Sequence, residues 1–334
     1  MAGFMFRGKA VDVATSCRDH RGDDFASSRQ TACDLTVPAS DLMLPHQMPE
    51  SVIDMQAHDI SLEAGLDIHY FHRSGTGPVL IFLHPSSGYG RMWQETTAYL
   101  PAEYDVYAPD QRGHGDSSRP DGEYSAEELS RDLKLFVDKL GVGRVIVAGH
   151  SLGGRVALCF AAAYPDHTAG LIMVAGPHLS NFYQTRDAVK TVYTTAYKTM
   201  VSETKFASRE AALAYISAFR PNDSPTAWKH RVDYNMTHAA DGTVVVKYDP
   251  VRVAEGLTHQ LVDLKYAAAA VTCPTAFIRG TGSAEMTPHA AQDVAKFWTR
   301  TTVDIHAVEA KANLQIENPE GLAKAITEFI HQRL

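Results

Sequence analysis

From residue 58 onward, short apolar stretches alternate with longer segments in which apolar residues recur at helical spacing. The stretches His58–Leu62 and Leu66–Phe71 alternate apolar and polar positions around Glu63–Gly65, which predicts an antiparallel hairpin at a sheet edge. Six further apolar stretches predict buried strands: Val79–Leu83, Asp105–Pro109, Val145–Gly149, Leu171–Val174, Thr275–Ile278 and Thr302–His306. Strands that alternate with helices predict an α/β fold with a mostly parallel sheet and right-handed crossovers.

The strand-helix alternation stops between about Pro177 and Lys265. This segment favours helix and carries aromatic residues at uneven spacing, so it predicts a helical cap inserted into the sheet domain, and Tyr183 and Trp228 are its candidate substrate contacts. We therefore divide the chain into an N-terminal extension (1–55), a core in two pieces (56–177 and 266–334) and a cap (178–265). The extension shows no helical or strand periodicity, and it is a candidate for contacts between subunits of a homo-oligomer.

Composition narrows the classes of partner. The 334 residues carry a net charge of −8, which argues against nucleic acid or an anionic membrane as the main partner. No apolar stretch is long enough to span a bilayer, and no signal or transit peptide is evident. The four cysteines are scattered without metal-type spacing, which favours free thiols in a cytoplasmic protein. We expect a small-molecule substrate, no cofactor and no metal.

The sequence Gly149-His-Ser151-Leu-Gly153 links a predicted buried strand to a predicted helix. Two glycines allow the backbone to pass close to itself where a strand turns sharply into a helix. Such a turn presents the Ser151 hydroxyl at the carboxyl end of the strand, above the positive end of the helix dipole. The alternative is a tight turn in which Ser151 merely caps the helix.

Together with the order of elements, four motifs resemble the α/β-hydrolase family, in its serine-nucleophile, esterase- or lactonase-like branch, over roughly residues 58–334. The motifs are Gly149–Gly154, Leu83–Ser86, Asp110–Ser117 and Ile316–Glu320. The resemblance implies that Ser151 is the nucleophile and that the backbone N–H groups of Leu152 and Ser86 form the oxyanion hole. Ser87 is expected to add a hydroxyl contact to the substrate. His84 and the Asp110–Gly113 turn are expected to be structural.

The sequence departs from the family at the general base. The family places its catalytic histidine five residues before the glutamate of a Glu-Asn-Pro sequence, and here that position is Ala312. Alanine cannot accept a proton, so the expected base is missing. One explanation is natural loss or relocation of the base, for which His178 is the best-placed replacement. The other, which we favour because the remaining motifs are intact, is deliberate replacement of a parental histidine.

The acid of the triad is irregular as well. The family commonly places an aspartate three residues after a glycine that follows the strand Thr275–Ile278, and here Ser283 occupies that position. Glu285 is the nearest carboxylate and is the candidate acid.

The resemblance thus implies a serine hydrolase that cleaves an ester or lactone of a small apolar or aromatic substrate, with an impaired base in this chain. One alternative is hydrolysis of a carbon–carbon bond in aromatic catabolism, against which His150 and Pro85 both count. Another is a non-catalytic ligand receptor on the same fold.

Overall fold

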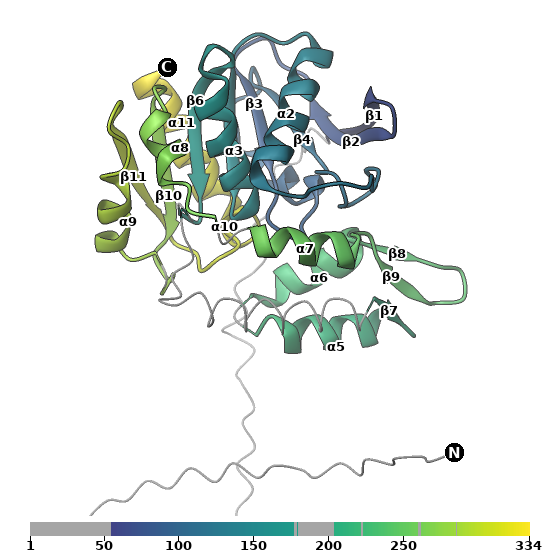
Figure 1. Ribbon diagram of the computed structural model, residues 1–334. Helices are drawn as coiled ribbons and strands as arrows, with labels where there is room; N and C mark the ends of the chain where they lie inside the picture. Colours follow the sequence, from purple (N-terminus) through teal and green to yellow (C-terminus); the bar gives the residue numbers. More distant parts are fainter. Residues whose placement is uncertain (1–54, 177–178, 180–203, 222, 260–261, 285) are drawn as a thin grey trace, which may run out of the picture. The chain divides into compact units, whose positions relative to one another are not determined.

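The computed structural model describes residues 55–176, 179, 204–221, 223–259, 262–284 and 286–334. The N-terminal extension (1–54 of the predicted 1–55) and the predicted residues Tyr183, His178 and Glu285 lie outside the described residues. Within residues 49–334, which form one compact unit, the fold is a central sheet covered by helices on both faces, with an insert between its sixth and seventh strands (Figure 1).

The central sheet has eight strands in the order β1-β2-β4-β3-β5-β6-β10-β11. The first pair is the predicted hairpin, and it is antiparallel, as is the β2–β4 pair. All other neighbours are parallel, which confirms the expected mostly parallel sheet. The strands are β1 (Gln56–Glu63), β2 (Leu66–Arg73), β3 (Val79–Leu83), β4 (Asp105–Pro109), β5 (Val145–His150), β6 (Thr168–Val174), β10 (Thr275–Gly280) and β11 (Val303–Val308).

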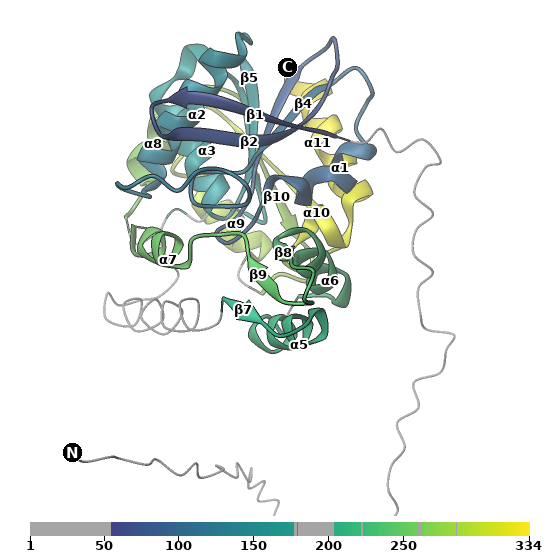
Figure 2. The ribbon, with the colours of Figure 1, turned by 90° about the vertical axis from the view of Figure 1, so that its right-hand side faces the viewer.

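Two layers of helices bury the faces of this sheet (Figure 2). One layer contains α2 (Ala126–Leu140), α3 (Leu152–Ala163) and α8 (Lys265–Ala270). The other contains α1 (Gln94–Ala98), α10 (Leu314–Glu317) and α11 (Pro319–Arg333). Short 3₁₀ turns, η2 (Gly90–Trp93) and η3 (Pro165–His167), and the helix α9 (Pro288–Ala295) complete the core. The N-terminus of α2 is capped as its sequence predicts, because the Ser125 hydroxyl accepts the Glu128 N–H at 3.2 Å.

The insert contains helices, as expected, together with a small sheet that the sequence pattern does not indicate. Its helices are α5 (Arg209–Phe219), α6 (Pro225–Tyr234) and α7 (Pro250–His259). Its antiparallel sheet has the order β7-β9-β8, formed by Lys205–Phe206, Val244–Val246 and Met236–His238. A separate hydrophobic cluster that includes Phe206, Ile216 and Val232 holds these elements together. We call this insert the cap.

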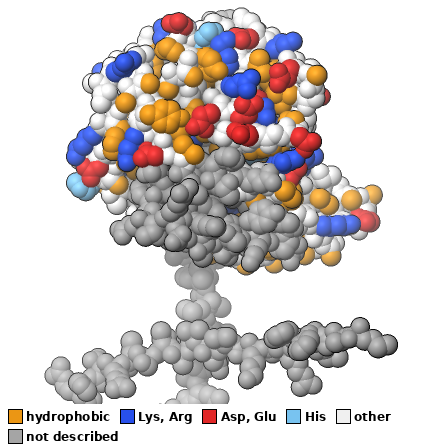
Figure 3. All heavy atoms as spheres, in the orientation of Figure 1, with side chains coloured by type: hydrophobic (Ala, Val, Ile, Leu, Met, Phe, Trp, Pro, Cys, Tyr) orange, Lys and Arg blue, Asp and Glu red, His pale blue; other side chains and the backbone are white. Residues whose placement is uncertain are grey.

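The described surface carries mixed charges (Figure 3), and the described cysteines are free thiols. On the face shown in Figure 3, acidic and basic side chains are interspersed among apolar ones. Cys159 and Cys273 are buried free thiols, and burial raises their pKa values to about 12 and about 11. Both therefore stay protonated near neutral pH. Among the described helices, none is both long and apolar enough to cross a membrane.

Candidate active site

Ser151 lies at the turn between β5 and α3, in a backbone conformation that side chains rarely adopt. Its φ is 52° and its ψ is −111°, and its hydroxyl makes no capping hydrogen bond to the helix. A non-glycine residue at positive φ is strained, and such strain persists only where the surrounding structure enforces it. The alternative interpretation of Ser151 as an ordinary helix cap is therefore wrong, because its hydroxyl does not bond the N-terminal N–H groups of α3.

Close backbone packing at two glycines enforces this turn. A Cβ atom on Gly149 would lie 2.2 Å from the carbonyl carbon and oxygen of Gly153. A Cβ on Gly153 would lie 2.3 Å from the Leu83 carbonyl oxygen. Both neighbours are main-chain atoms, so no side-chain rotation relieves the overlap. The start of α3 is thereby pressed against the end of β3, as the motif predicts.

The loop after β3 lies beside Ser151 because its strand and β5 are parallel neighbours, with Leu83 opposite Gly149. The chain continues from β3 to β4 on one side and reaches β5 on the other, so this is the switch point of the sheet. Ligands of open α/β sheets bind at such points. Ser86, Ser87 and Leu152 are thus brought to the same edge as Ser151, although their roles in substrate binding stay predictions.

Two buried histidines hold this loop in place. His84 accepts the Gln111 N–H at Nε2 (2.9 Å), and its Nδ1 donates to the Pro85 carbonyl (2.9 Å). His114 accepts the Ser87 N–H at Nε2 (3.1 Å). Burial lowers the pKa of His84 well below its usual value and that of His114 to about 4. Both imidazoles are therefore neutral near pH 7 and act as fixed acceptors, which agrees with the structural role expected for His84.

The turn at Asp110 also holds the chain that follows this loop, through hydrogen bonds to backbone N–H groups. The buried Asp110 carboxylate accepts the N–H groups of Gly90 and Asp116, and burial raises its pKa to about 6. His69, Asp110 and Asp116 place potential metal-ligand atoms within 4.8 Å of one another. However, Asp116 already pairs with Lys247 at 2.7 Å, and Asp110 is committed to backbone N–H groups. We assign this cluster a structural role.

The segment that should supply the base follows β11. Ala312 is exposed in the turn between that strand and α10, at the same edge of the sheet as Ser151. The Glu317 carboxylate accepts the Lys311 N–H at 2.7 Å and so closes the turn around Ala312. An open pocket of about 340 Å³ adjoins it, lined by Ser224, Thr281, Gly282, Glu309, Ala310, Lys311 and Glu317. A larger side chain at position 312 would therefore meet little steric resistance.

The cap contacts the loop after β3 through hydrogen bonds to Ser87. The sequence predicted only a substrate contact for this residue. Ser87 has a φ of 55°, and its carbonyl accepts hydrogen bonds from Arg231 Nη1 (2.6 Å) and Asn235 Nδ2 (2.8 Å). Its hydroxyl accepts one from Arg220 Nη2 at 3.1 Å. Single arginines in a helical segment give no local signal of such a role, so the sequence offered no means of finding them.

A second cap contact joins the buried side chains of Tyr89 and His230 to the half-buried Glu95. His230 on α6 accepts the Tyr89 hydroxyl proton at Nδ1 and donates from Nε2 to Glu95 at 3.1 Å. Tyr89 follows the loop after β3, so these hydrogen bonds connect the cap to η2 and α1. A separate hydrogen bond holds His150, the residue before Ser151: the buried Gln315 amide donates to its Nδ1 at 3.2 Å.

Trp228, a predicted substrate contact, packs against the hydrophobic cluster of the cap. Its indole N–H donates to the Arg220 carbonyl at 2.8 Å. The ring thus stabilises the cap and fixes the backbone of Arg220, whereas its contact with substrate stays a prediction.

Comparisons with known proteins agree with this geometry. A family model described as "alpha/beta hydrolase fold" matches residues 78–319. The 2-(acetamidomethylene)succinate hydrolase of Mesorhizobium japonicum is 26% identical over 258 residues, which cover 77% of this chain and 89% of that protein. An esterase of Mycobacterium tuberculosis is 27% identical over 263 residues, covering 78% of this chain and 85% of the relative.

Solved structures show the same fold. The crystal structure of an E-2-(acetamidomethylene)succinate hydrolase matches with a TM-score of 0.71 at 24% identity, covering 83% of this chain and 99% of that one. The enol-lactonase of Burkholderia xenovorans matches with a TM-score of 0.66 at 20% identity, covering 81% and 99% of the two chains.

Proposed function

Because the chain belongs to the α/β-hydrolase fold family, we propose that it is a serine hydrolase that cleaves a carboxylic ester or lactone through an acyl-enzyme. Ser151 is the nucleophile, and the N–H groups of Leu152 and Ser86 receive the oxyanion. The observation that carries this proposal is the strained backbone at Ser151. This backbone presents the Ser151 hydroxyl beside the N-terminus of α3, where it makes no capping hydrogen bond.

The reaction needs a base at position 312. An imidazole there would take the Ser151 hydroxyl proton as the oxygen attacks the substrate carbonyl. The resulting imidazolium would give that proton to the leaving alkoxide, and the same imidazole would then activate water to hydrolyse the acyl-enzyme. Alanine performs none of these transfers, so we propose that this chain is an impaired variant in which Ala312 replaces a histidine. Glu285 remains the proposed acid.

Relatives point to acyl substrates. Their names describe a hydrolase of a succinate derivative, an esterase and an enol-lactonase. A non-catalytic ligand receptor is the second candidate, because an exposed alanine occupies the position of the base. The cytoplasmic location and an oligomer formed through residues 1–55 stay predictions.

Restoring the base tests the proposal. We expect Ala312→His to raise hydrolysis of p-nitrophenyl acetate and of simple lactones by about 10²- to 10⁴-fold near pH 7.5, the range that a positioned general base contributes. Ala312→Asn is the matched control, since it adds a side chain of similar length that cannot accept the proton. Adding Ser151→Ala to the Ala312→His chain should abolish the gain. If Ala312→His brings no gain on any acyl substrate, the receptor function is favoured.

A further inference from the structure

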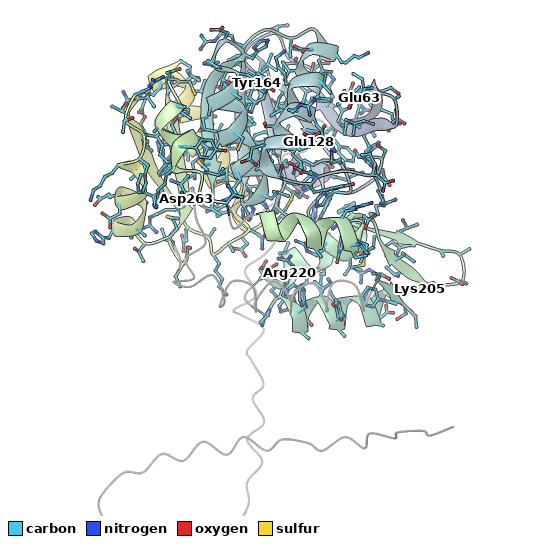
Figure 4. All side chains as sticks on the ribbon, viewed as in Figure 1. Glu63, Glu128, Tyr164, Lys205, Arg220 and Asp263 are labelled. Atoms are coloured by element: carbon cyan, nitrogen blue, oxygen red, sulfur yellow. The ribbon has the colours of Figure 1, made fainter. Side chains whose placement is uncertain are left out.

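Two arginines of the cap converge on the loop that holds the proposed oxyanion donor. Arg220 ends α5 and Arg231 lies within α6, and both hydrogen-bond Ser87, the residue after Ser86 (Figure 4 labels Arg220). The backbone of Arg220 is fixed from both sides, because its N–H donates to the Ile216 carbonyl (2.8 Å) and its carbonyl accepts the Trp228 indole N–H. Its guanidinium donates to the Ser87 hydroxyl at 3.1 Å.

The positive charge of this pair is incompletely balanced. Asp223 reaches Arg220 Nη1 at 4.0 Å, the limit of an ion pair, and no carboxylate of the described residues pairs with Arg231. The proximity of Arg231, together with burial, lowers the pKa of Arg220 to about 10. Two neighbouring guanidiniums repel each other, and an anion that joins them would relieve this repulsion.

Holding Ser87 does not require both charges. The Ser87 carbonyl is satisfied by Arg231 and by the neutral amide of Asn235, and its hydroxyl needs only one donor. A guanidinium has five N–H donors, and each of these arginines makes a single hydrogen bond to a described residue. Most of their donors therefore make no hydrogen bond to a described residue, and the side chain of Arg220 is 30% exposed, whereas Arg231 is buried.

We propose that Arg220 and Arg231 bind a carboxylate of the substrate, so that the hydrolase acts on an ester or lactone that carries an acidic group near the scissile carbonyl. Planar guanidiniums match a carboxylate through paired N–H donors, which gives orientation as well as affinity. The position next to Ser86 sets the distance between the two groups of the substrate. The claim that the anion belongs to a substrate cleaved near Ser86 rests on the proposed function, whereas anion binding by the two arginines does not.

Tyr248 is a further candidate donor to the same anion. Burial raises the pKa of Tyr248, whereas the positive charges of Arg231 and Arg220 act to lower it. A protonated phenol is a further donor to an anion. The proposed anionic substrate differs from the apolar or aromatic one that the aromatic spacing of the cap favoured, and the binding experiment below distinguishes the two.

Binding to the chain as it stands is the first test, and it requires no turnover. Isothermal titration with succinate, monomethyl succinate and dimethyl succinate should show saturable binding of the acids only. Arg220→Gln should weaken succinate binding by about tenfold or more, the loss expected when a charge-assisted hydrogen bond is removed. Arg209→Gln is the matched control, because it removes a cap arginine that pairs with Asp233 on the surface. Equal binding to the parent and Arg220→Gln, or none to the parent, would overturn the proposal.

Turnover is the second test and separates the two proposals. In the Ala312→His chain, mono-p-nitrophenyl glutarate should be cleaved with a lower KM than p-nitrophenyl butyrate, and Arg220→Gln should remove that preference mainly through KM. Arg220-dependent succinate binding without turnover by Ala312→His would keep the anion site and reject the hydrolase. Turnover with equal KM values for the two esters would keep the hydrolase and reject the anion site.

Discussion

The candidate site has two sides that lie at one edge of the sheet but are built differently. On the nucleophile side, formed by the loop after β3 and the turn at Ser151, main-chain atoms touch and buried imidazoles hold the loop. On the base side, formed by the turn between β11 and α10, Ala312 is exposed beside an open pocket. In the proposed mechanism, stabilisation of the oxyanion depends on backbone geometry, which the fold enforces. The proposed proton transfer depends on one side chain, which could be replaced without disturbing the fold.

The largest expected effect is a loss of folding stability caused by a substitution on the nucleophile side. Gly153→Ala should lower the free energy of unfolding by about 4 kcal/mol or more, because its Cβ would overlap the Leu83 carbonyl and neither backbone can yield. Chemical denaturation measures this change. Gly143→Ala is the control, since its Cβ would meet nothing within 4 Å, and it should change stability by less than about 0.5 kcal/mol. A stable, fully folded Gly153→Ala protein would contradict the packing described for the nucleophile side.

An intermediate effect concerns pH. His114 has a folded pKa of about 4 against the ordinary 6.5, so the native state binds fewer protons than the unfolded state between these values. Its contribution to stability is complete above about pH 6.5 and falls with pH, by about 2 kcal/mol at pH 5. His114→Gln retains an acceptor for the Ser87 N–H without this titration, so its stability should fall less between pH 7.5 and pH 5.

The difference between the unfolding curves of the parent and His114→Gln isolates His114 from other titrating groups. Asp110 works in the opposite direction, since its raised pKa of about 6 makes stability fall as pH rises from about 4 to 6. Parallel curves for the parent and His114→Gln would show that this imidazole is readily protonated in the folded state.

The smallest effect belongs to the base side. Glu317→Gln keeps an oxygen that accepts the Lys311 N–H, and burial already raises the pKa of the Glu317 carboxyl. We expect a change in unfolding free energy of less than about 1 kcal/mol, measured by denaturation at pH 7. A loss comparable to that of Gly153→Ala would mean that the base side is as tightly constrained as the nucleophile side.

The elements that the sequence predicted are those with a repeating local signal. The hairpin of β1 and β2, the parallel strands and the turn at Ser151 each follow from apolar periodicity joined to glycine positions. The three strands of the cap are two or three residues long, which is too short for an alternating pattern to appear. They form because β9 pairs with both neighbours, and the sequence does not encode that pairing locally.

The site divides in the same way. The candidate positions Ser151 and Ala312 follow from motifs of fixed spacing, and both lie where strands end. Arg220, Arg231 and Asn235 lie in the cap, far along the chain from Ser87, and meet it only after α5 and α6 fold back onto the loop. Tertiary convergence of single polar residues leaves no periodic signal, so physical reasoning from sequence finds the proposed nucleophile and misses the cap residues that are proposed to bind the substrate.

The hold of Arg231 and Asn235 on the Ser87 carbonyl has a consequence for building chimeric enzymes. Ser87 adopts a left-handed backbone conformation, and two donors of the cap stabilise its carbonyl in that orientation. A transplanted cap without an arginine and an asparagine at these positions would remove both donors and release the loop that is proposed to receive the oxyanion. The cap and this loop must therefore be exchanged together, as one cassette, if a recombined protein is to keep the turn after β3.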